Sequence, residues 1–221
     1  MSAVRQGLRR ALELALPRHR FLVRGPATSA AVALTFDDGP HPEYTPRLLD
    51  LLADHQLKAT FFVIGREAER HPELLARIVS EGHDIGHHSW SHSEPANTST
   101  ATLLAEIERT NALLWEPAGV IPMIVRPPKG QLTIGKLLRL LAHGERIILW
   151  SVDPKDYAMT SSAPLVTWAR ESRFTAGDVI LLHDSHPFCL EAIPALAQRL
   201  KALGLGAVPL GKWLPIDRAR Q

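Results

Sequence analysis

Two adjacent carboxylates, Asp37 and Asp38, follow a short apolar run and precede Gly39 and Pro40. The run, residues 31–36, ends at a turn signal, which is typical of a buried strand. An ionised carboxylate is costly to bury unless it is paired or bound to a metal. A single Asp beside Gly and Pro would be explained as a turn that ends the strand. Two acids at this position indicate a working site.

His88 and His92 offer nitrogen ligands that could complement these acids. Their spacing of four residues would place both imidazoles on one face of a helical turn. Two imidazoles and one carboxylate, from Asp37 or Asp38, form a familiar three-ligand set for catalytic Zn²⁺ and leave one position for water. His87 is a rival ligand, but the residue four positions later is a serine, which is a poor ligand.

The aspartate that does not bind the metal can act as a general base, because a metal lowers the pKa of its bound water to about 7. Arg126 can hold this base through bidentate hydrogen bonds. The two prolines at 127–128 stiffen the backbone and Gly130 lets it turn, so the main-chain N–H of Lys129 can be aimed at a developing oxyanion. Taken alone, this segment would be a stiff surface loop.

His183 ends a second apolar run, residues 179–182, and can act as the general acid that protonates a leaving amine. Asp156 can pair with His183 and raise its pKa, which keeps the imidazole protonated near neutral pH. Leu181 and Tyr157 can form a dry wall around a small acyl methyl group. A base, a metal-activated water, an oxyanion donor and an acid together predict hydrolysis of an amide or an ester.

The elements that must position these groups alternate along the chain. Strands are expected at 31–36, 58–64, 83–86, 121–125, 146–152, 178–182 and 207–210, and helices at 43–54, 72–79, 98–115, 132–142, 162–173 and 190–203. About seven strands that alternate with helices predict an α/β protein with a parallel sheet and helical crossovers. No glycine-rich nucleotide loop follows the first strand, which favours a single-domain, distorted (β/α) barrel over an open sheet. The polar clusters would then converge on one face.

The composition is that of an ordinary globular chain. The 221 residues suit one domain, and the net charge of +2 gives little reason to expect nucleic acid as a partner. The one cysteine, Cys189, cannot form an internal disulfide, so the fold does not depend on an oxidising compartment. No apolar stretch is long enough to span a bilayer.

Residues 1–24 differ from the expected catalytic domain, residues 25–221. They hold six arginines against one glutamate, and apolar residues recur at every fourth position from Val4 to Leu16, on one helical face. The segment lacks the continuous apolar core and the small-residue cleavage site of a secretory signal. We favour a helix that covers one end of the domain, and the alternative is a basic amphipathic helix on an anionic membrane surface.

In this order, the polar segments resemble the five motifs of the polysaccharide deacetylase family, also called the NodB-homology domain or carbohydrate esterase family 4. The matching segments are Thr35-Phe36-Asp37-Asp38-Gly39, His88-Ser89-Trp90-Ser91-His92, Arg126-Pro127-Pro128-Lys129-Gly130, Asp153-Pro154-Lys155-Asp156-Tyr157 and Leu181-Leu182-His183. Each motif is short, but the ordered set is specific. The resemblance implies a distorted (β/α) barrel and a hydrolase of carbon–nitrogen bonds other than peptide bonds. Such an enzyme removes N-acetyl, and sometimes O-acetyl, groups from an oligosaccharide, polysaccharide or glycolipid.

The resemblance also assigns roles that spacing leaves open. It implies a divalent metal, Zn²⁺ ahead of Co²⁺, Ni²⁺ or Mn²⁺, held by Asp38, His88 and His92. Asp37 would be the base, held by Arg126, and His183 would be the acid, tuned by Asp156. The length and the missing signal sequence resemble cytoplasmic rhizobial chitooligosaccharide deacetylases. We therefore expect a cytoplasmic protein, peripheral to the inner face of the membrane if residues 1–24 bind lipid.

Two positions depart from the family pattern. Lys129 stands where Tyr is usual; the backbone N–H is retained, but a cation there would favour an anionic sugar or a lipid phosphate. Tyr157 stands where Trp is usual and adds a hydroxyl near the acyl pocket. Two alternatives remain: a metal-independent hydrolase of small amides on the same barrel, and a carbohydrate-binding module with a dead site. The first is disfavoured because no member of the metal set is missing.

Overall fold

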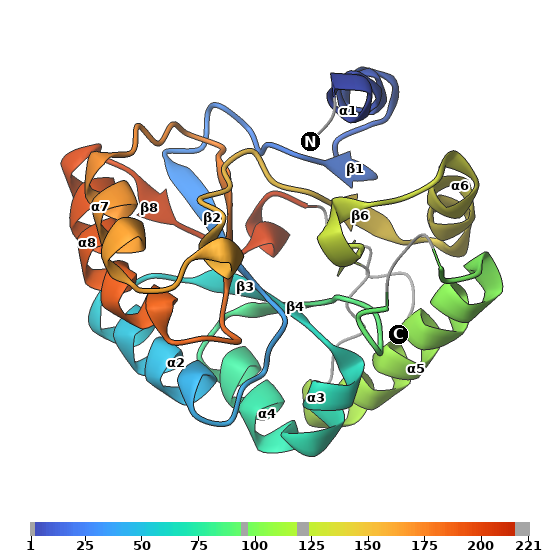
Figure 1. Ribbon diagram of the computed structural model, residues 1–221, viewed down its shortest axis with the longest axis horizontal. Helices are drawn as coiled ribbons and strands as arrows, with labels where there is room; N and C mark the ends of the chain where they lie inside the picture. The colour runs from blue at the N-terminus through green and yellow to red at the C-terminus, as the bar shows by residue number, and fades with distance from the viewer. Residues whose placement is uncertain (1–2, 94–96, 119–123, 215–221) are drawn as a thin grey trace.

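The computed structural model describes residues 3–93, 97–118 and 124–214 (Figure 1). The strands are β1 (Phe21–Leu22), β2 (Ala31–Asp37), β3 (Ala59–Val63), β4 (Asp84–His87), β5 (Ile124–Val125), β6 (Arg146–Ile148), β7 (Val179–His183) and β8 (Gly206–Ala207). The helices are α1 (Ala3–Ala15), α2 (Tyr44–Asp54), α3 (Gly65–Arg70), α4 (Pro72–Ser80), α5 (Thr100–Ala118), α6 (Ile134–His143), α7 (Ala163–Glu171) and α8 (Phe188–Ala202). Short 3₁₀ turns cover Pro128–Gly130, Asp156–Ala158 and Leu210–Lys212.

The strands form one parallel sheet in the order β1-β6-β5-β4-β3-β2-β7, and β8 adds to β2. The chain beyond β6 reaches across to β7, where Val152 forms a parallel bridge with Ile180 and the N–H of Leu181 donates to the Val152 carbonyl at 3.0 Å. Helices α2 to α8 surround the strands on the outside (Figure 1). The predicted distorted (β/α) barrel is therefore confirmed, because the sheet is curled and one bridge joins the segment after β6 to β7.

The structure differs from the sequence expectation in some elements. Phe21 and Leu22 form a strand that pairs with β6, although they lie in the segment expected to be an N-terminal helix. The strand expected at 207–210 is shorter and earlier, because a 3₁₀ turn begins at Leu210. Part of the strand expected at 121–125 lies outside the described residues; the described part is β5. No helix among the described residues is long and apolar enough to cross a membrane.

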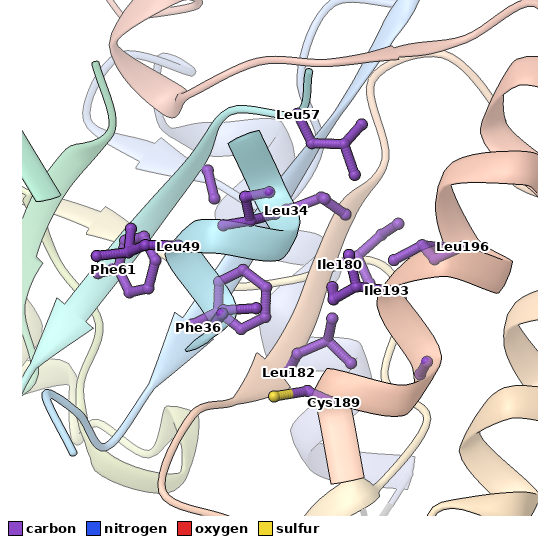
Figure 2. Packing of buried hydrophobic residues seen from close by; sticks show 14 of the residues in the cluster. Leu34, Phe36, Leu49, Leu57, Phe61, Ile180, Leu182, Cys189, Ile193 and Leu196 are labelled. Carbon is purple, nitrogen blue, oxygen red and sulfur yellow. The ribbon is translucent and has the colours of Figure 1, made fainter. Parts of the chain in front are cut away.

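Strand β2 is buried along its whole length, yet its two faces differ. Leu34 and Phe36 pack outward against α2 and α8 in the main hydrophobic cluster (Figure 2). Thr35 and Asp37, at the alternate positions, face the barrel interior and contact Arg126. Because side chains alternate across a strand, one short segment supplies both a core face and a polar interior face. Burial of the outward face fixes the position of Asp37 at the end of β2.

Candidate active site

The predicted site residues meet at the carboxyl ends of the strands. Asp37, at the end of β2, is in register with His183 at the end of β7. A pocket of about 880 Å³ is lined by eight of the ten predicted site residues, namely Asp37, Asp38, His88, His92, Lys129, Tyr157, Leu181 and His183. The other two, Arg126 and Asp156, are fully buried behind the pocket and contact Asp37 and His183. The barrel thus brings together groups that lie far apart in the sequence.

Asp38, His88 and His92 form a compact set of metal-ligating atoms, all within 4.8 Å of one another. The Oδ1 atom of Asp38 lies 3.6 Å from Nε2 of His88 and 3.4 Å from Nε2 of His92. This oxygen is buried and has no hydrogen-bond partner among the described residues. An orphaned carboxylate oxygen that faces two imidazole nitrogens fits a divalent metal ion.

His88 is held in the state that a metal ligand requires. Its Nδ1 lies 2.7 Å from the carbonyl oxygen of Arg126, to which the protonated Nδ1 donates, and this leaves the Nε2 lone pair directed toward Asp38. Burial lowers the pKa of His88 to about 3, more than the charge of Asp38 raises it. The imidazole is therefore neutral at physiological pH and can bind a cation.

The segment from His88 to His92 is a loop, so the helical turn expected from the spacing of the two histidines is wrong. Ser89 and His92 have left-handed backbones, with φ of 64° and 54°, which a helix cannot accommodate. The N–H of His92 donates to the Ser89 hydroxyl at 3.0 Å. From α5, Glu106 accepts hydrogen bonds from the backbone N–H groups of residues 90–91 at 3.1 and 3.3 Å. The imidazole rings of His88 and His92 are therefore brought together by a loop that α5 anchors, and not by a helical turn.

Arg126 positions Asp37, but through one contact only. Its Nη1 donates to Oδ1 of Asp37 at 2.6 Å, and the same nitrogen donates to the Thr35 hydroxyl at 2.8 Å. The remaining donors bind the carbonyl oxygens of residues 148–149, so the expected bidentate geometry is wrong. Burial raises the pKa of Asp37 and the Arg126 charge opposes this, with a net rise. The Oδ2 atom stays 3.7 Å from Nε2 of His88, beside the metal cluster.

His183 is paired with Asp156 as predicted. Its Nδ1 lies 2.7 Å from Oδ1 of Asp156, and its backbone N–H donates to the Oδ2 atom at 2.8 Å. Burial lowers the pKa of His183, but the hydrogen bond and charge of Asp156 outweigh it and raise the pKa to about 9. The imidazole is protonated at neutral pH, which is the state of a general acid.

Residues 24–145 match the family model described as polysaccharide deacetylase. The chain belongs to the polysaccharide deacetylase family. It is 34% identical over 208 residues to a peptidoglycan-N-acetylglucosamine deacetylase of Bacillus cereus, and the match covers 92% of this chain and 75% of that protein. It is 35% identical over 158 residues to a chitooligosaccharide deacetylase of a Bradyrhizobium strain, which covers 71% of this chain and 72% of that protein.

The structural comparison agrees with the sequence comparison. The crystal structure of the Bc1960 peptidoglycan N-acetylglucosamine deacetylase superposes with a TM-score of 0.82 at 35% identity, and covers 88% of this chain and 92% of that chain. Polysaccharide deacetylases of this family, carbohydrate esterase family 4, are in general metal-dependent, and this member has a cluster that can hold a metal.

The two departures from the family pattern lie at the pocket wall of this polysaccharide deacetylase. Lys129 has a left-handed backbone, with φ of 55°, in the turn after Arg126. A side chain at Gly130 would come within 2.6 Å of the Trp150 ring, so this turn needs a glycine. Tyr157 packs its ring edge-on to His183 at 5.5 Å but remains 59% exposed, whereas Leu181 is 3% exposed. Only Leu181 forms a dry wall as expected.

Sequence reasoning missed several residues around the deacetylase site. Asp184 accepts a hydrogen bond from the Thr45 hydroxyl at 2.6 Å and lies against Gly39, where a Cβ atom would come within 2.2 Å of its carboxylate. The one feature of the sequence that could have pointed to Asp184 is its position directly after His183. Arg9 of α1 lines the pocket as well. No pattern in the sequence connects a residue of the N-terminal helix with strand ends more than a hundred positions away.

Proposed function

We propose that the protein hydrolyses the N-acetyl group of a sugar in an oligosaccharide, a polysaccharide or a glycolipid. The observation that carries this proposal is that two buried pairs share one pocket with the set of metal-ligating residues. In the first pair Arg126 holds Asp37, in the second Asp156 holds His183, and both Asp37 and His183 line the pocket. A base and a protonated acid that share a pocket with a metal-ligand set suit amide hydrolysis.

The donor set fits a divalent cation, and we propose Zn²⁺. One carboxylate oxygen from Asp38 and two imidazole nitrogens from His88 and His92 are the ligand types that Zn²⁺ prefers in catalytic sites. When bound, the ion would supply Lewis-acid activation of a water molecule and of the acyl oxygen. Co²⁺, Ni²⁺ and Mn²⁺ accept the same ligands, so cellular supply also determines the native metal.

The protein's own residues then perform the proton transfers. Asp37 accepts a proton from the water that attacks the acyl carbon, and Arg126 holds Oδ1 while Oδ2 remains directed toward the metal cluster. A carbon–oxygen bond forms and the carbon–nitrogen bond breaks. His183 donates its Nε2 proton to the leaving nitrogen, because Asp156 occupies Nδ1. The products are acetate and a free amine, and the N–H of Lys129 is the proposed donor to the oxyanion.

Acetate release from defined substrates tests this function. The panel contains chitooligosaccharides, peptidoglycan fragments and acetylated glycolipid precursors, each assayed with Zn²⁺-loaded and chelator-treated protein. We expect acetate from at least one class, and we expect release to stop when the metal is removed and to resume when Zn²⁺ is added back. Turnover that persists without metal would favour the metal-independent hydrolase. Oligosaccharide binding without acetate release would favour the dead carbohydrate-binding module.

Two variants serve as controls for the assigned roles. Asp37→Asn keeps a side chain of the same size beside the buried Arg126. The variant should lose turnover and retain one metal ion per chain. His92→Ala removes a ligand that is partly exposed, and should lose both metal and turnover. Metal content is measured by atomic emission and folding by thermal denaturation. Stoichiometric metal in His92→Ala would contradict the ligand assignment.

A further inference from the structure

The pocket extends well beyond the metal cluster and becomes apolar. Beneath α1 it is lined by aliphatic and aromatic side chains from α1, β1, α6, β6 and the segments next to them. These are Leu12, Phe21, Leu132, Ile134, Leu137, Ile147, Leu149 and Trp150. The hydroxyl groups of a sugar would find no hydrogen-bond partners on aliphatic side chains, and burying them there would be unfavourable. This part of the pocket suits an aliphatic chain better than a second sugar ring.

Arg9 projects a cation into the same region. It lines the pocket, and its guanidinium carbon lies 5.8 Å from the centre of the Trp150 ring. Burial lowers the pKa of Arg9, while Glu13 and Asp153 act in the opposite direction. Among the described residues, no carboxylate lies within 4 Å of Arg9. The guanidinium charge is thus partly buried without a direct ion pair. Lys129 lines the pocket too. Asp153 is the carboxylate outside the Asp37–Asp38 pair that lines the same pocket, so Arg9 and Lys129 outnumber it there. An anionic group of the substrate would complement these two cations.

Helices α1 and α6, which contribute to the pocket, also expose apolar side chains. Leu14 on α1 is 83% exposed, and Ile134 and Leu138 on α6 are 57% and 59% exposed. Tyr157, at the pocket rim, is 59% exposed. These four are among only five large hydrophobic residues that are exposed in the described part of the chain. Ile134 and Tyr157 also line the pocket, so its opening presents apolar side chains to a ligand.

We propose that the pocket binds an anionic amphiphile, namely an N-acetylated sugar joined through a phosphate to an aliphatic chain. The aliphatic chain lies between α1 and α6, the phosphate meets Arg9, and the acetamido group reaches the metal cluster. This inference rests on the proposed deacetylation and names its substrate class. A longer N-acyl group in the same apolar region is the competing occupant, and it would not require a phosphate.

Binding of simple alkyl phosphates tests the site without relying on turnover. Zn²⁺-loaded full-length protein is titrated by calorimetry with octyl phosphate, butyl phosphate, inorganic phosphate and the neutral octyl glucoside. Each methylene that the pocket buries can tighten binding by up to about fourfold, so octyl phosphate should bind at least about tenfold more tightly than butyl phosphate. It should also bind more tightly than octyl glucoside. Equal affinity for octyl phosphate and inorganic phosphate would overturn the proposal.

Two arginines of α1 provide a matched pair of variants. Arg9→Gln removes the cation that lines the pocket, and should weaken octyl phosphate binding by about tenfold or more. Arg10→Gln removes the same charge from an exposed position on the same helix, outside the pocket lining, and should leave the affinity unchanged. If both variants weaken binding equally, the effect is one of net charge and the proposal fails. The melting temperatures of both variants are compared first.

Turnover then separates this inference from the proposed function. Acetate release is compared for the octyl phosphodiester of N-acetylglucosamine 1-phosphate, for N-acetylglucosamine 1-phosphate itself and for a neutral chitooligosaccharide. We expect kcat/KM for the octyl phosphodiester to exceed the other two by about tenfold or more. Turnover of all three without that preference overturns the substrate class and leaves the deacetylation standing. No acetate from any of the three, nor from the peptidoglycan fragments of the first panel, contradicts the deacetylation, and the calorimetry still decides whether the pocket binds the amphiphile.

Discussion

At the scale of single residues, the partner of each histidine determines its chemistry. His88 and His183 are both buried, but His88 contacts a backbone carbonyl and has a pKa of about 3, whereas His183 contacts a carboxylate and has a pKa of about 9. At His88 the cost of burying a positive charge exceeds what the nearby Asp38 charge and the bond to the carbonyl return, whereas at His183 the hydrogen bond and charge of Asp156 exceed that cost. At the same pH one imidazole is therefore neutral, as a metal ligand must be, and the other is protonated, as a general acid must be.

The pH dependence of kcat/KM should report His183. Because its pKa is raised to about 9, the imidazole keeps its proton below that pH and loses it above. Activity that requires the acid is therefore present at neutral pH and declines as the pH rises through about 9. Asp156→Asn removes the charge that raises the pKa, so the decline should begin at lower pH.

A control variant distinguishes this effect from a general change in pocket charge. Asp153→Asn removes a carboxylate that accepts the N–H of Lys155 at 2.8 Å, whereas the carboxylate that pairs with His183 is that of Asp156. In this variant, kcat/KM should decline over the same alkaline pH range as in the unaltered protein. An unshifted profile in Asp156→Asn, with intact metal content, would assign the alkaline decline to another group.

At the scale of elements, the sequence predicted where most strands end but not how the loops between them fold. The strand expected at 146–152 ends at Ile148, and the one expected at 207–210 ends at Ala207. The alternation of apolar runs and polar clusters was sufficient to predict the carboxyl-end site, because parallel strands in a barrel share one face. The loop from His88 to His92 was not predictable from its spacing. Its shape depends on two left-handed residues and on Glu106, which α5 supplies from later in the chain. Strand β1 was missed because two residues carry no periodicity.

Glu106 is predicted to control metal affinity without touching the metal. It holds the backbone N–H groups of residues 90–91 and the hydroxyl of Ser91, so its loss should loosen the ligand loop. Glu106→Ala should weaken Zn²⁺ binding by about tenfold or more, which is typical of residues that orient metal ligands. The measurement is competition with a chelating dye.

The matched control lies two residues along the same helix. Glu108 is exposed and pairs with His143 at 3.3 Å, so Glu108→Ala should leave Zn²⁺ affinity unchanged. The two variants remove the same charge from the same helix, and they differ in whether the carboxylate contacts the ligand loop. Equal affinity in both would show that the loop keeps its shape without Glu106.

At the scale of the whole molecule, the N-terminal helix is part of the domain surface. Leu12 and Leu16 pack against the hydrophobic cluster that includes Phe21 and Ile147, which supports the interpretation that α1 covers one end of the domain. Figure 1 shows α1 at the edge of the molecule beside β1. The helical periodicity indicated which face of α1 would be apolar. It could not indicate that this face borders the pocket, because the contacts join residues far apart in the sequence.

Contact of α1 with a membrane remains a prediction. We propose that the protein is cytoplasmic and that α1 binds the inner face of the membrane. Residues 1–24 hold six arginines, and Leu14 on α1 is 83% exposed. Full-length protein should sediment with vesicles that contain anionic lipid, should bind neutral vesicles weakly, and should be released by salt, which screens the attraction. Deletion of residues 1–20, which spares β1, should abolish sedimentation. Leu14→Asp keeps the packed face of α1 intact and should reduce sedimentation as well, so equal binding by all three proteins would exclude α1 as the membrane contact.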